Sequence, residues 1–253
     1  MKMHEILLDS IKYPLLGWKQ LILFGLANLI FAAILGNYDQ LYTYFDTNSS
    51  NLALFSILII SLLALIFSTF LEAGYSFKII EKSVKMIETP PKFSGFISMT
   101  KHGFNETLIL FIYFLMPFIS LLALIDDIST QLNFGIPPIP DNIFIWIIFL
   151  TVILGFIADI FFTVAIPHMA FKGGSLKDAF NFIEIANKMN QIGLKRLIIG
   201  YLLVIIGVVV IGGPILKEAI KSINLFGFVI AELIVAPYII MFSARFIALI
   251  YRE

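Results

Sequence analysis

The sequence contains no cysteine and few charged residues. The absence of cysteine from the 253 residues excludes disulfide bonds, thiolate nucleophiles and cysteine metal sites. Charged residues make up only 13% of the chain, against about 25% in ordinary globular domains. Seventeen Lys and Arg balance 17 Asp and Glu, so the chain lacks the basic excess of a nucleic-acid-binding domain. The composition therefore excludes nucleic acid as a partner and is not that of a soluble domain.

Signatures of enzyme chemistry are also missing. The His-Glu-x-x-His motif of zinc proteases, the Gly-x-Ser-x-Gly motif of α/β-hydrolases and the Walker A motif do not occur. His4, His102 and His168 are far apart in sequence, which favours ordinary interfacial histidines over a metal site. Asp126-Asp127 is a pair of potential oxygen ligands, but a solvated loop is the simpler interpretation. We therefore expect a protein that is not an enzyme and carries no cofactor or metal.

Apolar residues dominate what is present. They make up 60% of the chain, a fraction that a soluble protein of this size could not hide from water. Six apolar runs approach or exceed the roughly 20 residues that a membrane-spanning helix needs. The sequence therefore predicts an all-α polytopic integral membrane protein, with residues 1–253 forming one domain of six transmembrane helices. The runs are Leu21–Leu35, Leu52–Phe77, Leu108–Ile125, Ile143–Phe171, Leu197–Ile215 and Leu225–Tyr251.

The basic residues predict how the chain is oriented. Lys and Arg cluster in the N-terminal arm, in alternate connections and at the C-terminal end, and the opposite side keeps only Lys217 and Lys221. Because cytoplasmic segments are enriched in Lys and Arg, we expect a multi-pass cell-membrane protein with both termini in the cytoplasm. A cleaved signal peptide ending near Ala32-Ala33 is the alternative interpretation of the first run. The long patterned arm before that run favours a retained span.

The spans alternate between short and long, and an amphipathic stretch precedes each short one. This order predicts three hairpin repeats at residues 1–78, 92–172 and 175–253, each formed by a cytoplasmic interfacial helix, a short span and a long span. The alternative is that any protein of six helices arranged in hairpins shows some of this pattern. The amphipathic faces consist of Leu7, Ile11, Leu15 and Trp18; of Phe93, Phe96, Ile97 and Phe104; and of Leu176, Phe180, Ile183 and Met189.

Ionisable residues within the apolar runs are the candidates for function. Such groups cost about 2.5–3.5 kcal/mol to insert into a bilayer and often mark ion or proton paths. Asp159 and Glu232 are the two clear cases, and Asn28 is the expected hydrogen-bond partner of Asp159. Their functional interpretation is a proton or ion path, whereas the structural one is a protonated carboxyl that joins neighbouring helices. The sequence favours the structural interpretation.

A second pair of charged residues falls near the cytoplasmic ends of the long spans. Glu72 and Arg245 each lie about 12 Å from the centre of their helix. Because their depths match, they are expected to form an ion pair if the first and third repeats touch.

Several short motifs resemble a known family. They are Ser10-Ile11-Lys12-Tyr13-Pro14, Glu72-Ala73-Gly74-Tyr75, Pro90-Pro91-Lys92-Phe93, Lys101-His102-Gly103-Phe104 and Ala179-Phe180-Asn181-Phe182. Together they are similar to an uncharacterised, mainly archaeal, family of prokaryotic membrane proteins, the family of unknown function numbered 4013. The resemblance covers nearly the whole chain and implies a membrane fold, but it brings no activity, cofactor or catalytic residue. The family's linker usually has acidic or Trp residues where this chain has Lys92 and Phe93, which puts a ligand role of the linker in doubt.

Two functions remain open on this basis. The favoured one is a non-enzymatic membrane scaffold or partner-binding module, with the lipid bilayer as its expected partner and an unidentified protein or a second copy as the open alternatives. The alternative is a small secondary transporter or channel that uses intramembrane carboxylates. An intramembrane enzyme is the weakest interpretation. The direction in which Asp159 points distinguishes the first two, because a transporter needs a cavity at that residue.

Overall fold

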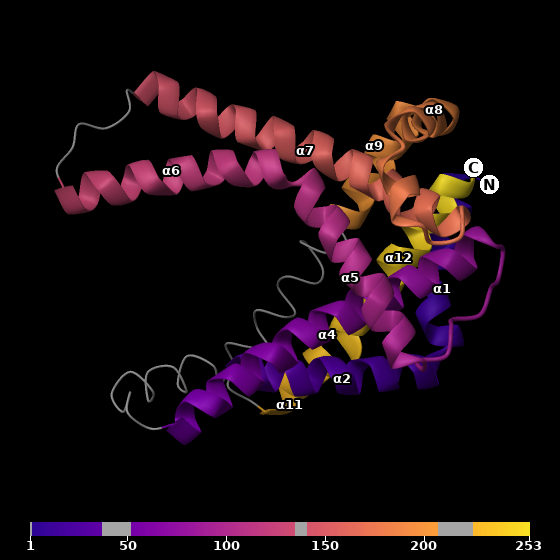
Figure 1. Cartoon of the computed structure of the whole chain (residues 1–253). Coiled ribbons are helices and arrows are strands. Elements are labelled where there is room, and N and C mark those ends of the chain that lie inside the picture. The colour runs from indigo at the N-terminus through magenta and orange to yellow at the C-terminus, as the bar shows by residue number, and fades with distance from the viewer. Residues whose placement is uncertain (1, 37–51, 135–140, 207–224) are drawn as a thin grey trace.

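The computed structural model describes residues 2–36, 52–134, 141–206 and 225–253, and all regular elements in these ranges are helical (Figure 1). The first half of the chain forms α1 (Met3–Leu16), α2 (Trp18–Gly36), α4 (Leu52–Val84), α5 (Phe96–Tyr113) and α6 (Leu115–Phe134). The second half forms α7 (Asp141–Phe171), η1 (Leu176–Phe180), α8 (Phe182–Ile192), α9 (Leu194–Ile205), α11 (Leu225–Ile230), η3 (Ala231–Val235) and α12 (Ala236–Arg252).

Several helices are long and apolar enough to cross a membrane, as expected of a membrane protein. Three meet this criterion alone, at Phe55–Val84, Ile143–Phe171 and Gly227–Arg252. The pairs α1–α2 and α5–α6 meet it jointly, with bends of 77° and 60°, so the described residues provide three to five spans rather than the expected six. Part of the predicted fifth span lies outside the described residues, because its run continues from α9 to residue 215.

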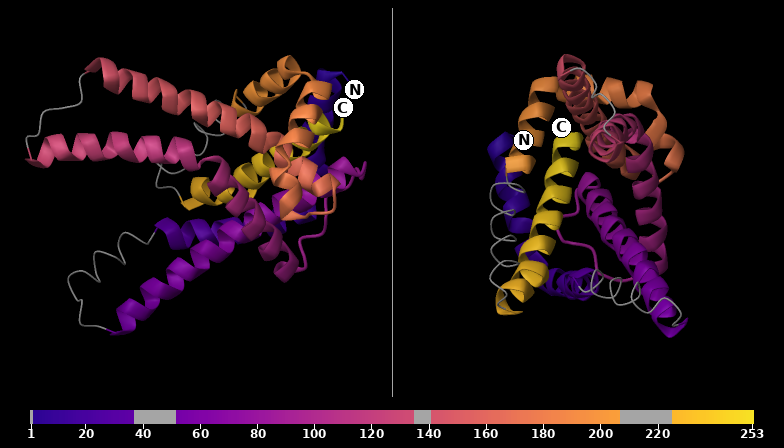
Figure 2. Two further views of the ribbon diagram at one scale, coloured as in Figure 1. Left: turned by 45° about the horizontal axis from the view of Figure 1, so that its top comes forward. Right: turned by 90° about the vertical axis from the view of Figure 1, so that its left-hand side faces the viewer.

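The long helices extend from a common end at which both termini lie. Figure 1 shows the α6–α7 pair and the α2–α4 pair diverging from this end, and the left view in Figure 2 places the N and C termini close together there. This arrangement agrees with two termini on one side of a membrane. The fully buried side chains, such as Tyr13, Tyr75, Met169 and Phe246, belong to the same end. The far parts of the hairpins carry exposed apolar side chains, as lipid-facing surfaces do.

The amphipathic stretches are largely helical, but they do not form three uniform interfacial helices, and the third is divided between η1 and α8 at Asn181. α1 ends at a bend next to Gly17, and α8 ends at Gly193. The middle stretch instead forms the first part of α5, which continues to Tyr113 without a break. The bend follows at Phe114 because Pro117 has no N–H to donate to the carbonyl of Tyr113. The strict order of interfacial helix, short span and long span is therefore not seen in the middle of the chain.

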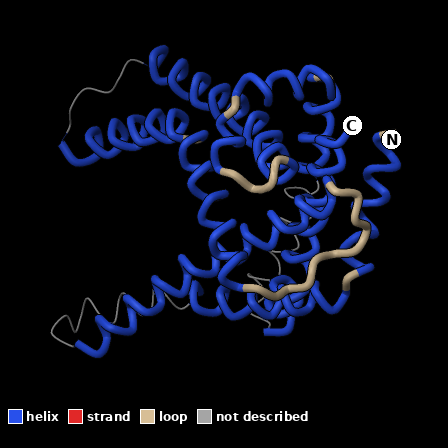
Figure 3. Tube along the Cα trace, turned by 45° about the vertical axis from the view of Figure 1, so that its right-hand side comes forward, coloured by secondary structure: helices blue, strands red, loops and turns tan. Residues whose placement is uncertain are grey.

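Two glycines allow α4 and α5 to pack with their backbones in contact. A Cβ atom added at Gly74 would overlap the carbonyl of Met99, and one added at Gly103 would overlap the carbonyl of Phe70. Small residues of this kind let helices approach closely in membranes. The loop between the two helices, residues 85–95, runs across the end that holds the termini (Figure 3). The close approach brings the N-terminal half of α5 alongside the C-terminal half of α4.

Glu232 lies in a π-helical turn, η3, directly before α12. Pro237 follows this turn and cannot donate to the carbonyl of Leu233, which a regular α-helix would require. Gly25 of α2 packs against that same carbonyl, where a Cβ atom would not fit. The turn thus fixes α2 against the start of α12.

Candidate functional site

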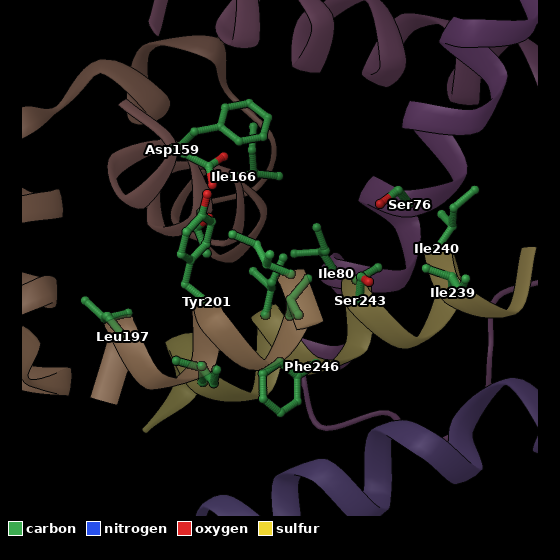
Figure 4. Close-up of a pocket in the computed structure, with 18 of the residues that line it drawn as sticks. Ser76, Ile80, Asp159, Ile166, Leu197, Tyr201, Ile239, Ile240, Ser243 and Phe246 are labelled. Atoms are coloured by element: carbon green, nitrogen blue, oxygen red, sulfur yellow. The ribbon is translucent and has the colours of Figure 1, made fainter. Parts of the chain in front are cut away.

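Asp159 is placed by α7 and faces α9. Its carboxyl group forms a hydrogen bond with the hydroxyl of Tyr201 on α9 (Figure 4). The Tyr201 ring also packs against Phe156, with ring centroids 5.5 Å apart. The partner of Asp159 is therefore Tyr201 rather than the expected Asn28. Asn28 is buried on α2, a helix that packs against η3, α4 and α12.

A cavity of about 460 Å³ lies beside this hydrogen bond. Its wall is formed by α4, α5, α7, α9 and α12, which include the three long apolar helices. We call it the polar cavity, because six polar residues interrupt a largely aliphatic and aromatic wall. They are Ser76, Glu106, Asp159, Thr163, Tyr201 and Ser243. Figure 4 shows Ser76 and Ser243 on one side and the Asp159–Tyr201 pair on the other. None of the residues that line the cavity is Lys, Arg or His.

Two polar atoms at the polar cavity are buried without a hydrogen-bond partner. They are Oε2 of Glu106 and Oγ of Ser243. Buried polar atoms are paired in the large majority of cases, so each unpaired one needs an explanation. Glu106 was missed at the sequence level because its Asn-Glu-Thr triplet precedes the apolar run that starts at Leu108. The continuous helix α5 carries it to the cavity wall instead of leaving it in a cytoplasmic connection.

One further carboxyl group, that of Glu72, lies close enough to Glu106 to interact with it electrostatically. Glu72 on α4 interacts with Glu106 on α5 and with Glu232 in η3. Carboxylates that share an apolar region repel one another unless protons or a cation neutralise them. The structure thus brings together acidic residues that are far apart in sequence. Within the described part of the chain, no three His, Asp or Glu side chains are grouped as metal ligands.

The expected partner of Glu72 is engaged elsewhere. Nε of Arg245 lies 2.7 Å from Oδ1 of Asp9, and its Nη1 donates to the carbonyl of Ile87 at 2.9 Å. The guanidinium group also covers the ring of Tyr13, 4.8 Å from its centroid. The structure therefore pairs Arg245 with Asp9 on α1 rather than with Glu72, because α12 packs against α1 along this face. Matching depth alone did not reveal which helix lies opposite Arg245.

His168 and His102 contact different residues in different parts of the structure. Nδ1 of His168 lies 2.8 Å from the Tyr251 hydroxyl, and its Nε2 lies 3.2 Å from Oε2 of Glu184. His102 stacks on Phe77, with ring centroids 4.7 Å apart. Both fit the structural interpretation of these residues better than a shared metal site.

Comparison with known proteins gives a family and no assigned chemistry. No curated protein and no solved structure matches the chain. The family model described as "Protein of unknown function (DUF4013)" matches residues 57–217, a stretch that includes the Gly74–Gly103 contact and the Asp159–Tyr201 hydrogen bond. Since this match covers more than half of the chain, the protein belongs to the DUF4013 family.

Proposed function

We propose that this protein is a small secondary transporter that binds its substrate in the polar cavity. The observation that carries the proposal is that Asp159 and Glu106, two carboxyl residues, line one cavity between three helices long enough to cross a membrane. Ligand sites commonly have volumes of about 300–1,000 Å³ and combine an apolar wall with a few polar groups. The 460 Å³ polar cavity has both properties.

The carboxyl groups supply a means of coupling transport to protons or cations. Ionisable residues within membrane helices commonly form such paths in transporters. Glu106 connects the polar cavity electrostatically to Glu72, and Glu72 connects it to Glu232. A proton or cation arriving at one of these groups changes the charge that the others experience, and so changes the affinity of the cavity for a charged substrate.

We also propose that the shared end of the molecule faces the cytoplasm, because Lys82, Lys85 and Lys92 lie at or beside the loop there. A cysteine at Lys85 should react with a membrane-impermeant thiol reagent in inverted vesicles and not in intact cells. Labelling of Lys85→Cys in intact cells would contradict this orientation. The natural absence of cysteine removes background labelling.

Cysteine accessibility also tests transport. Ser243→Cys is close to isosteric and places a thiol in the wall of the polar cavity. A transporter exposes its site to each side in turn, so a small cationic, membrane-impermeant thiosulfonate should label this cysteine both in intact cells and in inverted vesicles. The matched control is Ser68→Cys, a buried serine of α4 outside the cavity, which should stay unlabelled from both sides.

The other outcomes contradict the proposal. Labelling of Ser243→Cys from one side only would exclude translocation through the polar cavity. No labelling from either side would favour the scaffold interpretation, in which the Asp159–Tyr201 hydrogen bond simply joins α7 to α9.

A further inference from the structure

We infer that the polar cavity binds a small organic cation, such as a quaternary or protonated amine that carries an apolar group. This inference rests on the proposed function and specifies its class of substrate. It follows from the charges at the cavity, from the chemistry of its wall and from its unpaired polar atoms.

The polar cavity is lined by acidic residues and by no basic group. The acidic residues are Glu106 and Asp159. Arg245 is the nearest basic residue in sequence to the lining residues Ser243 and Ala244, but its guanidinium group is bound to Asp9, Ile87 and Tyr13 instead. When the carboxyl groups of the cavity are ionised, they repel an anionic substrate and attract a cation, and the apolar surroundings strengthen that attraction.

The wall of the polar cavity suits an organic cation better than a metal ion. Phe162, Tyr201 and Phe246 contribute aromatic rings, and aromatic faces attract ammonium groups through cation–π interactions. Most remaining lining residues are aliphatic and match the apolar part of such a molecule. A calcium ion, in contrast, requires about six to eight oxygen ligands. No three acidic or histidine residues are grouped for this purpose anywhere in the ranges that the structure describes.

The unpaired atoms indicate where the charged and polar parts of the ligand would bind. Oε2 of Glu106 is buried and lacks a partner, so any cationic group beside it would compensate its charge, and a protonated amine would also donate a hydrogen bond to it. Asp159 differs because Tyr201 already provides a hydrogen bond to its carboxyl. Glu106 is thus the main anchor for the cation, and Asp159 is the second acidic residue of the cavity wall.

A pair of isosteric probes tests the inference. Benzyltrimethylammonium is a cation with one aromatic ring, and neopentylbenzene has the same shape without charge. The full-length protein in mild detergent is titrated with each probe, and the midpoint of thermal unfolding is recorded, because a ligand that binds only the folded state raises it. Protection of Ser243→Cys from a neutral maleimide reports whether the probe occupies the polar cavity. We expect saturable stabilisation and protection by the cation, and at least tenfold weaker effects from the neutral probe.

Variants of the carboxyl residues complete the test. Glu106→Gln should weaken binding of the cation about tenfold or more, because a charge-assisted contact becomes a neutral one. Asp159→Asn provides a second variant if Glu106→Gln does not fold. Glu81→Gln is the matched control, since Glu81 lies outside the cavity in an ion pair with Lys85, and it should change the affinity by less than about threefold.

The result that overturns the inference is equal binding of the two probes, or cation binding that neither Glu106→Gln nor Asp159→Asn weakens. Its failure is separable from failure of the proposed function. Two-sided labelling of Ser243→Cys with no preference for the cation would leave transport standing and refute the substrate class. Selective cation binding with one-sided labelling would support the ligand class and refute transport.

Discussion

Arg245 on α12 and Asp9 on α1 form a bidentate ion pair across 236 positions of sequence. Arg245 is only 3% exposed, and the side chain of Asp9 is 34% exposed. The pair joins the first helix of the chain to the last, while the bond from Arg245 to the carbonyl of Ile87 adds the loop after α4. It therefore organises the end of the molecule at which both termini lie.

Removing one member of this pair should destabilise the protein. Asp9→Asn should lower the free energy of unfolding by about 2 kcal/mol, because it leaves a buried guanidinium group without its counter-ion. Arg245→Gln should also be destabilising, and the double variant should lose less than the sum of the two. The measurement is unfolding by denaturing detergent. The exposed pair Glu81–Lys85 is the control, and its removal should cost less than about 0.5 kcal/mol. Additive effects of Asp9→Asn and Arg245→Gln would contradict the coupling.

The glycines between α4 and α5 give a second prediction. Gly74→Ala and Gly103→Ala should each lower the free energy of unfolding by about 1–3 kcal/mol, because the added methyl groups force the two backbones apart. Gly155→Ala on α7 is a matched control, since a Cβ atom there meets no other atom within 4 Å. It should be neutral or slightly stabilising, as alanine favours a helix more than glycine does. Thermal unfolding of the three variants in one detergent decides the point, and equal losses in all three would refute it.

These glycines also show how far the sequence alone could lead. Apolar run lengths predict the long helices and their approximate ends, because the thickness of the bilayer sets how long an apolar helix must be to span it. The Gly-Tyr and His-Gly-Phe motifs were recognisable in the sequence. Their role in packing could not be recognised, because it depends on Gly74 of α4 and Gly103 of α5 lying where the two helix backbones touch.

The candidate site was harder to predict for the same physical reason. Position along a span gives the depth of Asp159, but not the direction in which its side chain points or the helix opposite. Depth alone therefore favoured Asn28 and did not indicate Tyr201, whereas the structure places α9, which carries Tyr201, beside α7. Glu106 was overlooked because it precedes the apolar run that starts at Leu108. The composition of that run does not reveal that α5 begins earlier, at Phe96, and carries Glu106 at the cavity wall.

The contact between α7 and α8 should depend on pH. A hydrogen bond from Lys172, at 2.8 Å, holds the pKa of the Glu184 carboxyl below its usual 4.5, and the same bond raises the pKa of Lys172 above 10.5. Nε2 of His168 faces the same carboxyl oxygen. The stabilisation from a lowered carboxyl pKa is present above 4.5 and is lost as the pH falls through the lowered value. The stabilisation from a raised lysine pKa is present below 10.5 and is lost as the pH rises through the raised value.

A spin label on α8 measures this dependence. With a label at Asn190→Cys, an exposed position, mobility should stay constant from about pH 5 to 9 and rise at strongly acidic pH. In Glu184→Gln the acid step should disappear, because the group that titrates is gone. An acid step of unchanged size in Glu184→Gln would show that another group controls α8.

The Asp159–Tyr201 hydrogen bond predicts a definite order of stabilities. Asp159→Asn keeps an acceptor for the Tyr201 hydroxyl and should leave thermal stability in detergent almost unchanged. Asp159→Leu leaves that hydroxyl without its partner and should cost about 1–3 kcal/mol, and Tyr201→Phe should cost a similar amount by leaving the carboxyl unpaired. The double variant Asp159→Leu/Tyr201→Phe should recover part of the loss, because replacing both polar partners with apolar groups leaves neither stranded.

Asn28 provides the decisive comparison for this pair. It occupies a similar expected depth, but it is buried on α2, which packs against η3, α4 and α12, whereas Asp159 bonds to α9. Asn28→Leu and Asp159→Leu should therefore have additive effects on the free energy of unfolding, since distant sites without shared partners do not couple. A coupling of about 1 kcal/mol or more between Asn28 and Asp159, together with additivity between Asp159 and Tyr201, would reverse the assignment of partners. It would also show that the Asp159–Tyr201 hydrogen bond does not join α7 to α9.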